Sequence, residues 1–271
     1  MPAIQPARLK QQASLLAQHF DDPDAFVRSL HYLLEYYADR ARRPGQSGTP
    51  SPLIKSFNIR PPVLKQLTQE LTPLVQDFPE QGLALCDCLW NEPYLEFRIL
   101  AANLLGGIPP ELSEIIVGRV QVWLANDLDS ILIDSLLIQS LSGLRGQEPA
   151  AYLNLIKEWI NSDKDFYNQM GLRALLPLIK DPSFENLPIF YKLIQHLARS
   201  SSPAVKPDLL DVISALAVNS PSETAYFLRH TLNTPQATDT AWIIRQVLHV
   251  FPPEIAKNLR TMLREFRDTA K

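Results

Sequence analysis

The spacing of apolar residues constrains the fold of this chain more than any other feature. Apolar residues recur at i, i+3, i+4 and i+7 in segments such as LLAQHF, LHYLLEYYA, IIVGRVQVWL and ILIDSLLIQSL, whereas the alternation typical of strands is scarce. The chain has only nine glycines, and many of its 23 prolines stand at expected helix starts, where their missing N–H group would have no helical partner. These patterns predict an all-α protein of about a dozen helices of modest length.

A recurring tryptophan indicates how the helices are arranged. Trp90, Trp123 and Trp159 each stand near the end of an expected helix and just before a polar turn, and they are 33 and 36 residues apart. A two-helix unit that repeats every 33 to about 47 residues is typical of an α-solenoid of the HEAT or armadillo type. Because such units bury their apolar faces only against neighbours, we expect residues 1–271 to form a single curved domain. Proline, glycine and serine interrupt the pattern at residues 40–56, where we expect a mobile loop.

Length and charge limit the classes of protein to which the chain can belong. With 271 residues it can bury a substantial core, and its net charge of −3 argues against a protein that coats nucleic acid by bulk electrostatics. A local basic face remains compatible with that charge. No apolar stretch approaches the roughly 20 residues that span a bilayer, and the first residues lack the apolar segment of a signal peptide. We therefore expect a cytoplasmic monomer without a membrane partner.

Metal and cofactor chemistry finds little support in the sequence. The five histidines lack metal-ligand spacing, and neither a phosphate-binding glycine loop nor a Ser/His/Asp or Cys/His set is evident. The only two cysteines, Cys86 and Cys88, fall in a helical apolar pattern in which a bridge between them would be strained. We expect two reduced thiols, no metal and no cofactor.

Basic residues gather in two places. In the last helical segment they are spaced 3, 4, 3 and 4 apart on a face that differs from the apolar one: Lys257, Arg260, Arg264, Arg267 and Lys271. A second group lies along and after the expected loop: Arg40, Arg42, Arg43, Lys55, Arg60 and Lys65. Either group can be ordinary solvated surface, or the two can form basic rims of a concave solenoid that suit a phosphate backbone.

The segment WINSDKDF permits a structural and a functional interpretation. In the structural one, Asp163 or Ser162 caps a helix that begins near Asp165, and Trp159 is a core residue at a repeat junction. In the functional one, Trp159 and Asp163 place an aromatic plane and a carboxylate at the mouth of a turn. Such a pair can stabilise a cationic ligand, or the positive charge that develops on a sugar during bond cleavage.

Three segments, SFNIRPPVLKQLTQEL, LCDCLWNEPYLEFRILAANLL and IKEWINSD, together resemble the DNA alkylation repair family, the HEAT-like repeat alkylpurine DNA glycosylases. The first is similar to the family's starting turn, proline and basic helix, and the second to its LW element with an acidic-aromatic helix. The third is the most specific, because the family's catalytic aspartate lies four residues after a tryptophan, as Asp163 does after Trp159. The resemblance runs from about Lys55 to about Pro221.

The resemblance implies a concave, basic groove for duplex DNA and hydrolysis of the N-glycosidic bond of cationic N3- or N7-alkylated purines. Asp163 would be the catalytic carboxylate that stabilises the sugar cation, and Trp159 its aromatic companion. Because an alkylated base already carries positive charge, it can leave without acid catalysis. The other residues expected to contact DNA are Phe166, Arg173, Arg199, Lys206, Trp242 and Arg245.

The sequence departs from the family pattern in the segments DLDSILID and SPAVKPDLLDVISALAVNSP, which lack the tryptophans and arginine expected there. Fewer phosphate contacts should weaken binding to duplex DNA. We therefore expect an alkylation-repair-like DNA-binding protein, with glycosylase activity as the leading hypothesis. The alternatives are a non-catalytic relative that binds unusual DNA structures, and a HEAT-repeat scaffold that binds a protein partner.

Overall fold

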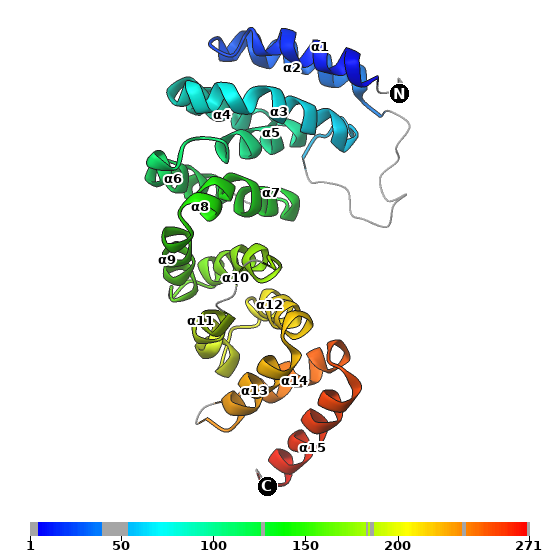
Figure 1. Ribbon diagram of the computed structural model, residues 1–271, viewed down its shortest axis with the longest axis vertical. Helices are drawn as coiled ribbons and strands as arrows, with labels where there is room; N and C mark the ends of the chain where they lie inside the picture. The colour runs from blue at the N-terminus through cyan, green and yellow to red at the C-terminus, as the bar shows by residue number, and fades with distance from the viewer. Residues whose placement is uncertain are drawn as a thin grey trace. The chain divides into compact units, whose positions relative to one another are not determined.

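The computed structural model describes residues 5–39, 54–125, 128–182, 184, 187–234 and 237–269. Within these ranges every regular element is a helix, and the β-bridge between Lys55 and Tyr94 is isolated (Figure 1). The predicted all-α class is therefore confirmed. The part of the expected loop at residues 40–53, including Arg40, Arg42 and Arg43, lies outside the described residues, as does Lys271.

The chain forms two compact units, Met1–Tyr152 and Leu153–Lys271. The first contains α1 (Pro6–Ala17), α2 (Pro23–Tyr37), α3 (Pro61–Asp77), α4 (Pro79–Asn91), α5 (Leu95–Leu105), η1 (Pro110–Leu112), α6 (Ser113–Leu124), α7 (Ser130–Ser135), the π-helical η2 (Leu136–Ser140), α8 (Ser142–Gln147) and the start of α9 (Pro149–Ile160). The second contains the rest of α9, then α10 (Asp165–Ile179), α11 (Leu187–Arg199), α12 (Lys206–Asn219), α13 (Pro221–Leu232), α14 (Thr240–Val247), η3 (Leu248–Val250) and α15 (Pro253–Thr269). The single domain expected over residues 1–271 stays a prediction.

The helices of the first unit stack through the faces that the apolar spacing predicts. α1 packs on α3, α3 on α5, and α5 on η2, while α2 packs on α4. On α3, a fully buried stripe recurs every four residues: Val63, Leu67, Leu71 and Val75. Burial of each such side chain contributes about 1.5 to 3 kcal/mol, which exceeds the differences in helix propensity among ordinary residues.

Trp90 and Trp123 form the junction between two successive repeats. Trp90 lies near the end of α4 and Trp123 near the end of α6, and their rings stack with centroids 4.4 Å apart and planes 5° from parallel. Both side chains are buried, and the guanidinium of Arg98 lies 5.5 Å from the Trp90 ring centroid. The recurrence of tryptophan in the first unit is therefore explained by packing between neighbouring helices.

Two of the segments that resemble the alkylation repair family meet in the first unit. Phe57 stacks on Tyr94 with ring centroids 4.6 Å apart, and the Leu95 N–H donates to the Lys55 carbonyl at 2.8 Å. The Ser56 hydroxyl donates to Oε1 of the buried Glu96 at 2.7 Å. Asn58, at φ 53°, takes the left-handed turn conformation that asparagine tolerates better than most residues.

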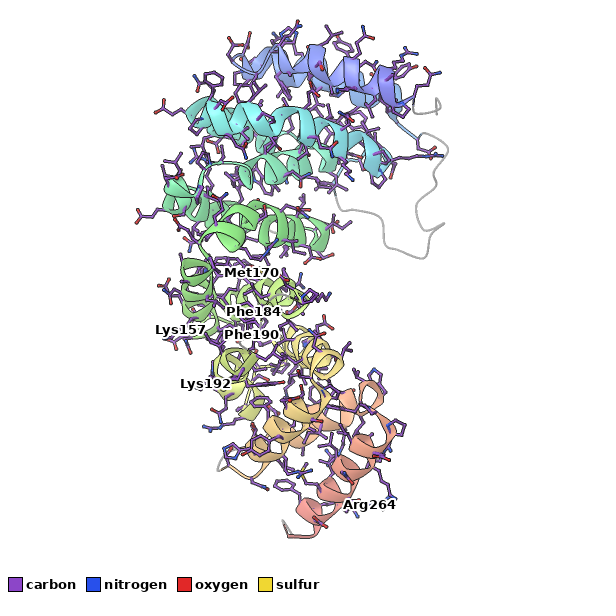
Figure 2. All side chains as sticks on the ribbon, in the orientation of Figure 1. Lys157, Met170, Phe184, Phe190, Lys192 and Arg264 are labelled. Atoms are coloured by element: carbon purple, nitrogen blue, oxygen red, sulfur yellow. The ribbon has the colours of Figure 1, made fainter. Side chains whose placement is uncertain are left out.

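The second unit has two layers of helices. α9, α11 and α13 form one layer and α10, α12 and α14 the other, as Figure 1 shows. Between the layers lies a continuous apolar core, which includes Met170 of α10 and Phe190 of α11 (Figure 2). Phe184, which precedes α11, stacks on Phe190 with ring centroids 4.8 Å apart.

The predicted amphipathic character of the last helix is confirmed by α15. Leu259 and Leu263 are buried, whereas the basic side chains of the described part of the stripe are exposed: Lys257, Arg260, Arg264 and Arg267. Figure 2 shows Arg264 on the outside of this helix. No helix in the described part of the chain, α15 included, is both long and apolar enough to cross a membrane.

The two cysteines are free, as predicted. Cys86 is fully buried in α4, and Cys88 is partly exposed on the same helix. Burial raises the pKa of both thiols above the ordinary cysteine value, so both stay protonated at neutral pH. A protonated thiol is a poor nucleophile, so neither residue has the properties of a reactive cysteine.

Candidate functional site

The turn between α9 and α10 is fixed by side chains from two helices. The Asn168 amide nitrogen, in α10, lies 3.1, 3.0 and 2.8 Å from the carbonyl oxygens of Trp159, Ile160 and Ser162. His196 of α11 approaches the same Ile160 carbonyl, with Nε2 at 3.1 Å. Trp159 and Ile160 end α9, and Ser162 follows it, at a point where helical N–H donors run out. The Ser162 N–H donates to the Trp159 carbonyl at 3.2 Å, and the side chains from α10 and α11 add further bonds that hold the turn.

Asp163 lies on this turn, and its side chain is exposed. Among the described residues, no hydrogen bond or ion pair engages its carboxylate. α10 begins at Asp165 as predicted, but its N-cap residue is Lys164, and no side chain caps it. The interpretation of Asp163 as a helix cap is therefore wrong, and the Ser162 hydroxyl accepts only the Lys164 N–H, at 3.3 Å. The carboxylate is therefore available to bind a ligand.

Trp159 lies beneath the turn, and only 3% of it is exposed. Its indole Nε1 is buried without a hydrogen-bond acceptor. The burial agrees with the structural interpretation of a core residue, and a ligand can reach the ring only after neighbouring side chains move. The aromatic contact predicted for Trp159 stays a prediction.

Gly171 allows α10 to lie close to the end of α9. A Cβ atom at this position would stand 2.6 Å from Ile160 Cγ1, 3.1 Å from the Ile160 nitrogen and 3.2 Å from the Trp159 Cβ. Real Cβ atoms do not come this close, so the backbone of the two helices would have to separate. The glycine thus determines how the end of α9 sits on α10.

We expect Gly171→Ala to destabilise the protein although alanine favours helix. The overlap with Ile160 should cost more than the roughly 1 kcal/mol gained in helix propensity, for a net loss of about 1 kcal/mol in the free energy of unfolding. Gly118→Ala in α6 is the control, because nothing lies within 4 Å of a Cβ there. It should stabilise by about 0.5 to 1 kcal/mol. Urea denaturation measures both, and a stabilised Gly171→Ala protein would contradict the close approach.

Phe166 and Tyr167 provide an aromatic surface on the first turn of α10, three and four residues after Asp163. Both are partly exposed, and their rings meet edge to face with centroids 5.5 Å apart. The Lys164 ammonium lies 5.9 Å from the Tyr167 ring centroid. Phe166 was predicted from the sequence, whereas Tyr167 was not, although it is the next aromatic residue along the chain.

Arg173 is engaged inside the protein. Its Nε lies 2.7 Å from Oδ1 of Asp208 in α12, and Asp208 is only 5% exposed. The Arg173 side chain is itself only partly exposed. Arg173 was predicted to contact DNA, but the carboxylate of Asp208, which the sequence did not indicate, balances the charge of its guanidinium.

Lys206 and Trp242, both predicted to bind DNA, meet across α12 and α14. The Lys206 ammonium lies 5.1 Å from the Trp242 ring centroid and 2.8 Å from Oδ1 of Asp239. Burial alone would raise the pKa of Asp239, but hydrogen bonds from Lys206 and the Ser201 N–H, with the charge of Lys206, hold it below its usual value. Asp239 therefore stays charged at neutral pH, and no pattern in the sequence indicated its role.

The remaining predicted contacts, Arg199 and Arg245, differ in exposure. Arg199 ends α11, and its Nε is buried without a hydrogen-bond acceptor. Its carbonyl accepts the Asp239 N–H at 3.0 Å. Arg245 is exposed on α14, three residues after Trp242, and no described residue pairs with it. Arg245 is therefore the cation of this set that is most available to a ligand.

Polar contacts link the N-terminal parts of α10, α12 and α14 at one edge of the second unit. The Gln169 amide of α10 donates to the Ala204 carbonyl, just before α12, at 2.8 Å. Lys206 at the start of α12 reaches Asp239 and Trp242 at the start of α14. Helix N-termini carry partial positive charge and unpaired N–H groups, which suit anions such as phosphate.

The part of the chain that contains this edge matches a known protein family. The family model described as DNA alkylation repair enzyme matches residues 32–245. The chain belongs to the DNA alkylation repair enzyme family. The match includes the α9–α10 turn with Asp163 and ends at Arg245, whereas the basic stripe of α15 lies beyond it.

A search of the curated proteins finds none that matches the chain. The resemblance to the DNA alkylation repair family predicted from the sequence is confirmed by the family model. In the described part of the chain, no three His, Cys, Asp or Glu side chains gather where they could hold a metal ion. The expected absence of a metal or cofactor stays a prediction.

Proposed function

We propose that this member of the family hydrolyses the N-glycosidic bond of cationic N3- or N7-alkylated purines in duplex DNA. The observation that most supports the proposal is the exposed carboxylate of Asp163, which has no protein partner among the described residues. The turn that bears it is fixed by Asn168 and His196. A carboxylate held in this way can stabilise positive charge as it develops on a sugar.

The proposed reaction needs little more than a well-placed negative charge. An N3- or N7-alkylated purine is already a cation, so the C1′–N bond breaks with the electron pair returning to the base, and no acid has to protonate it. The sugar is left as an oxocarbenium-like cation beside Asp163, and water then adds to C1′ and loses a proton. Phe166 and Tyr167 offer a nearby aromatic surface that can contact the cationic base.

The proposed partner is the phosphate backbone next to the alkylated nucleotide. The edge formed by the N-terminal parts of α10, α12 and α14 offers helix N-termini, and Arg245, in the last turn of α14, offers a positive charge that no described residue pairs. Arg173 and Lys206 contribute less net charge, because each is paired with an aspartate. We therefore propose a contact with duplex DNA that is weaker than one formed by unpaired arginines.

The direct test is release of free bases from methylated duplex DNA at low salt. The purified protein should liberate 3-methyladenine or 7-methylguanine, identified by chromatography, and leave abasic sites in the DNA. The same DNA without protein measures spontaneous loss. A folded protein that binds this DNA but releases no more base than the blank would contradict the proposed hydrolase activity.

Binding to duplex DNA should weaken steeply as salt rises. Each phosphate contact contributes about 0.9 to the slope of log K against log salt, so Arg245→Gln should reduce that slope by about one unit. Lys192→Gln is the matched control, because Lys192 is an exposed cation on α11, in the other layer of the same unit (Figure 2). Fluorescence anisotropy with a labelled duplex measures the slope. Equal slopes for the two variants would contradict a contact at Arg245.

The second candidate function is binding of unusual DNA structures without catalysis. Three observations favour it: the burial of Trp159, the Arg173–Asp208 pair and the Lys206–Asp239 pair. These contacts bury one predicted aromatic ring and pair two predicted cations, so less aromatic and cationic surface is available to contact a DNA substrate. This candidate predicts salt-dependent DNA binding without base release. Absence of both would favour the scaffold alternative with a protein partner.

A further inference from the structure

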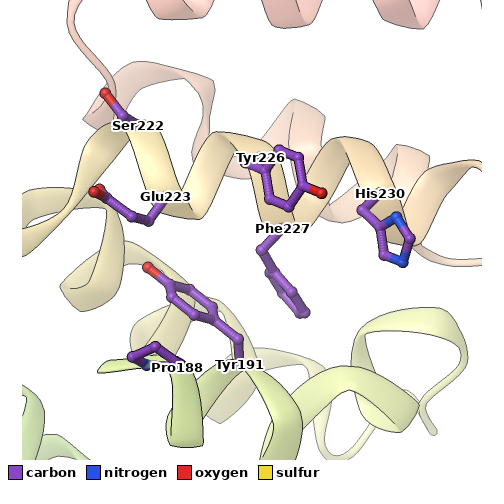
Figure 3. Close-up of a pocket in the computed structure, with 7 residues that line it drawn as sticks. All are labelled: Pro188, Tyr191, Ser222, Glu223, Tyr226, Phe227 and His230. Carbon is purple, nitrogen blue, oxygen red and sulfur yellow. The ribbon is translucent and has the colours of Figure 1, made fainter. Parts of the chain in front are cut away.

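A pocket of about 480 Å³ lies between α11 and α13 in the second unit, apart from the residues assigned above. Its volume is within the range of small-molecule sites. Figure 3 shows aromatic side chains from both helices around it, with Glu223 at one end and His230 at the other. Its lining includes Tyr191, Glu223, Tyr226, Phe227 and His230.

The walls of the pocket are largely aromatic faces. Tyr191 and Phe227 lie with ring centroids 5.1 Å apart and planes inclined by 32°. Tyr226 and His230, one helical turn apart on α13, have ring planes within 8° of parallel and centroids 6.2 Å apart. Tyr226 is 70% exposed, which is unusual for so large an apolar ring. Flat, partly exposed ring faces favour a flat ligand.

The hydrogen-bond directions make the Tyr191 oxygen an acceptor. The Thr224 hydroxyl donates its single hydrogen to the Ser220 carbonyl at 2.7 Å. The Tyr191 hydroxyl lies 2.9 Å from the Thr224 oxygen, so Tyr191 must be the donor of that bond. Its remaining lone pairs are then available only to a donor. Burial raises the pKa of Tyr191 above its ordinary value, so the phenol keeps this hydrogen at neutral pH.

Glu223 supplies the charge of the pocket. Its side chain is exposed, and no ion pair or hydrogen bond engages its carboxylate among the described residues. Glu223 and the Tyr191 oxygen are therefore both acceptors, beside aromatic faces whose electrostatic potential is negative. A ligand that suits the aromatic faces and Glu223 has a positive charge and a planar shape, and hydrogen-bond donors add contacts with the Tyr191 oxygen.

We propose that this pocket binds a flat organic cation. Such a ligand can place its charge over the aromatic faces and near Glu223 while its flat surface covers Tyr226 and Phe227. The inference goes beyond the proposed glycosylase activity and does not depend on Asp163. An alkylated nucleobase and an arginine side chain are both flat cations. Binding of model compounds for each distinguishes between these two sources.

The test compares a cation with a neutral molecule of similar shape. Calorimetric titration at pH 7 should show N-methylquinolinium binding at least about tenfold more tightly than 4-methylquinoline, because only the first is a permanent cation. Glu223→Gln should weaken binding of the cation roughly fivefold and leave the neutral ligand within about twofold. Glu254→Gln, which removes an exposed carboxylate from the first turn of α15, is the matched control and should change neither.

Further ligands identify the source of the cation. Preference for 1-methyladenosine over adenosine would support an alkylated nucleobase, and preference for N-acetylarginine amide over the citrulline compound would support a protein side chain. Tyr226→Ala, at an exposed position, should weaken whichever cation binds. Equal binding of N-methylquinolinium and 4-methylquinoline would overturn the proposal, as would equal effects of Glu223→Gln and Glu254→Gln.

Discussion

Asp163→Asn should lower the rate of base release from methylated DNA by at least about a hundredfold, the loss typical when a group that stabilises developing charge is removed. Asparagine has nearly the same size, and the Asp163 side chain is exposed with no partner among the described residues, so the fold should be unaffected. Single-turnover assays with DNA bound at saturation measure the chemical step without interference from weaker binding. Circular dichroism and the urea midpoint check the fold.

Asp165→Asn is the matched control for this experiment. Asp165 is an exposed carboxylate two residues further along the chain, at the first position of α10. Its replacement changes the net charge equally, and the rate of release should stay within about threefold of the unchanged protein. If Asp163→Asn released base at the original rate, or if both variants lost activity alike, Asp163 would not be the catalytic carboxylate.

Asn168→Ala should destabilise the protein by about 2 to 3 kcal/mol, which is large for a single polar side chain. The variant loses the donor that the carbonyls of Trp159, Ile160 and Ser162 share, and part of this region is closed to water. It should also slow base release by roughly tenfold, because the turn that bears Asp163 would no longer be fixed. Urea denaturation and the single-turnover assay measure the two effects.

Asn161→Ala is the control for the role of Asn168. The Asn161 amide also donates to a carbonyl of α9, that of Lys157 at 2.8 Å, but this bond is exposed to solvent. Its loss should cost less than about 0.5 kcal/mol, because water can replace it. Similar losses of stability for the two variants would show that Asn168 has no special part in fixing the turn.

The sequence predicted the elements of the fold because helix formation depends on local spacing. The i, i+4 stripe on α3 and the prolines at the starts of α3, α4 and α13 are readable without any tertiary information. The recurring Trp90 and Trp123 indicated a repeat, and their stacking explains it. The sequence also predicted that α10 begins near Asp165.

The candidate site was predictable only in part. The resemblance directed attention to Asp163 and to the cations Arg173 and Lys206, since those residues stand in a recognisable order along the chain. Asp208, the partner of Arg173, lies 35 residues away, and Asp239, the partner of Lys206, lies 33 residues away. Both separations are about one repeat, which is far beyond the i, i+3 and i, i+4 relations within a helix. A carboxylate on one helix can neutralise a cation on another only where the helices pack, so charge pairing of this kind cannot be deduced from spacing.

The sequence alone determined the all-α class, the positions of the helices and the membership of the DNA alkylation repair family, because these depend on patterns of consecutive residues. Only the tertiary structure decided that Trp159 is buried, that Asn168 and His196 fix the turn of Asp163, and that α11 and α13 enclose an aromatic pocket beside Glu223. The physical reason is that burial, hydrogen-bond direction and charge pairing depend on which helix faces meet. Those contacts join residues that stand on different helices, from 8 residues apart for Asn168 and Ile160 to 36 for His196 and Ile160.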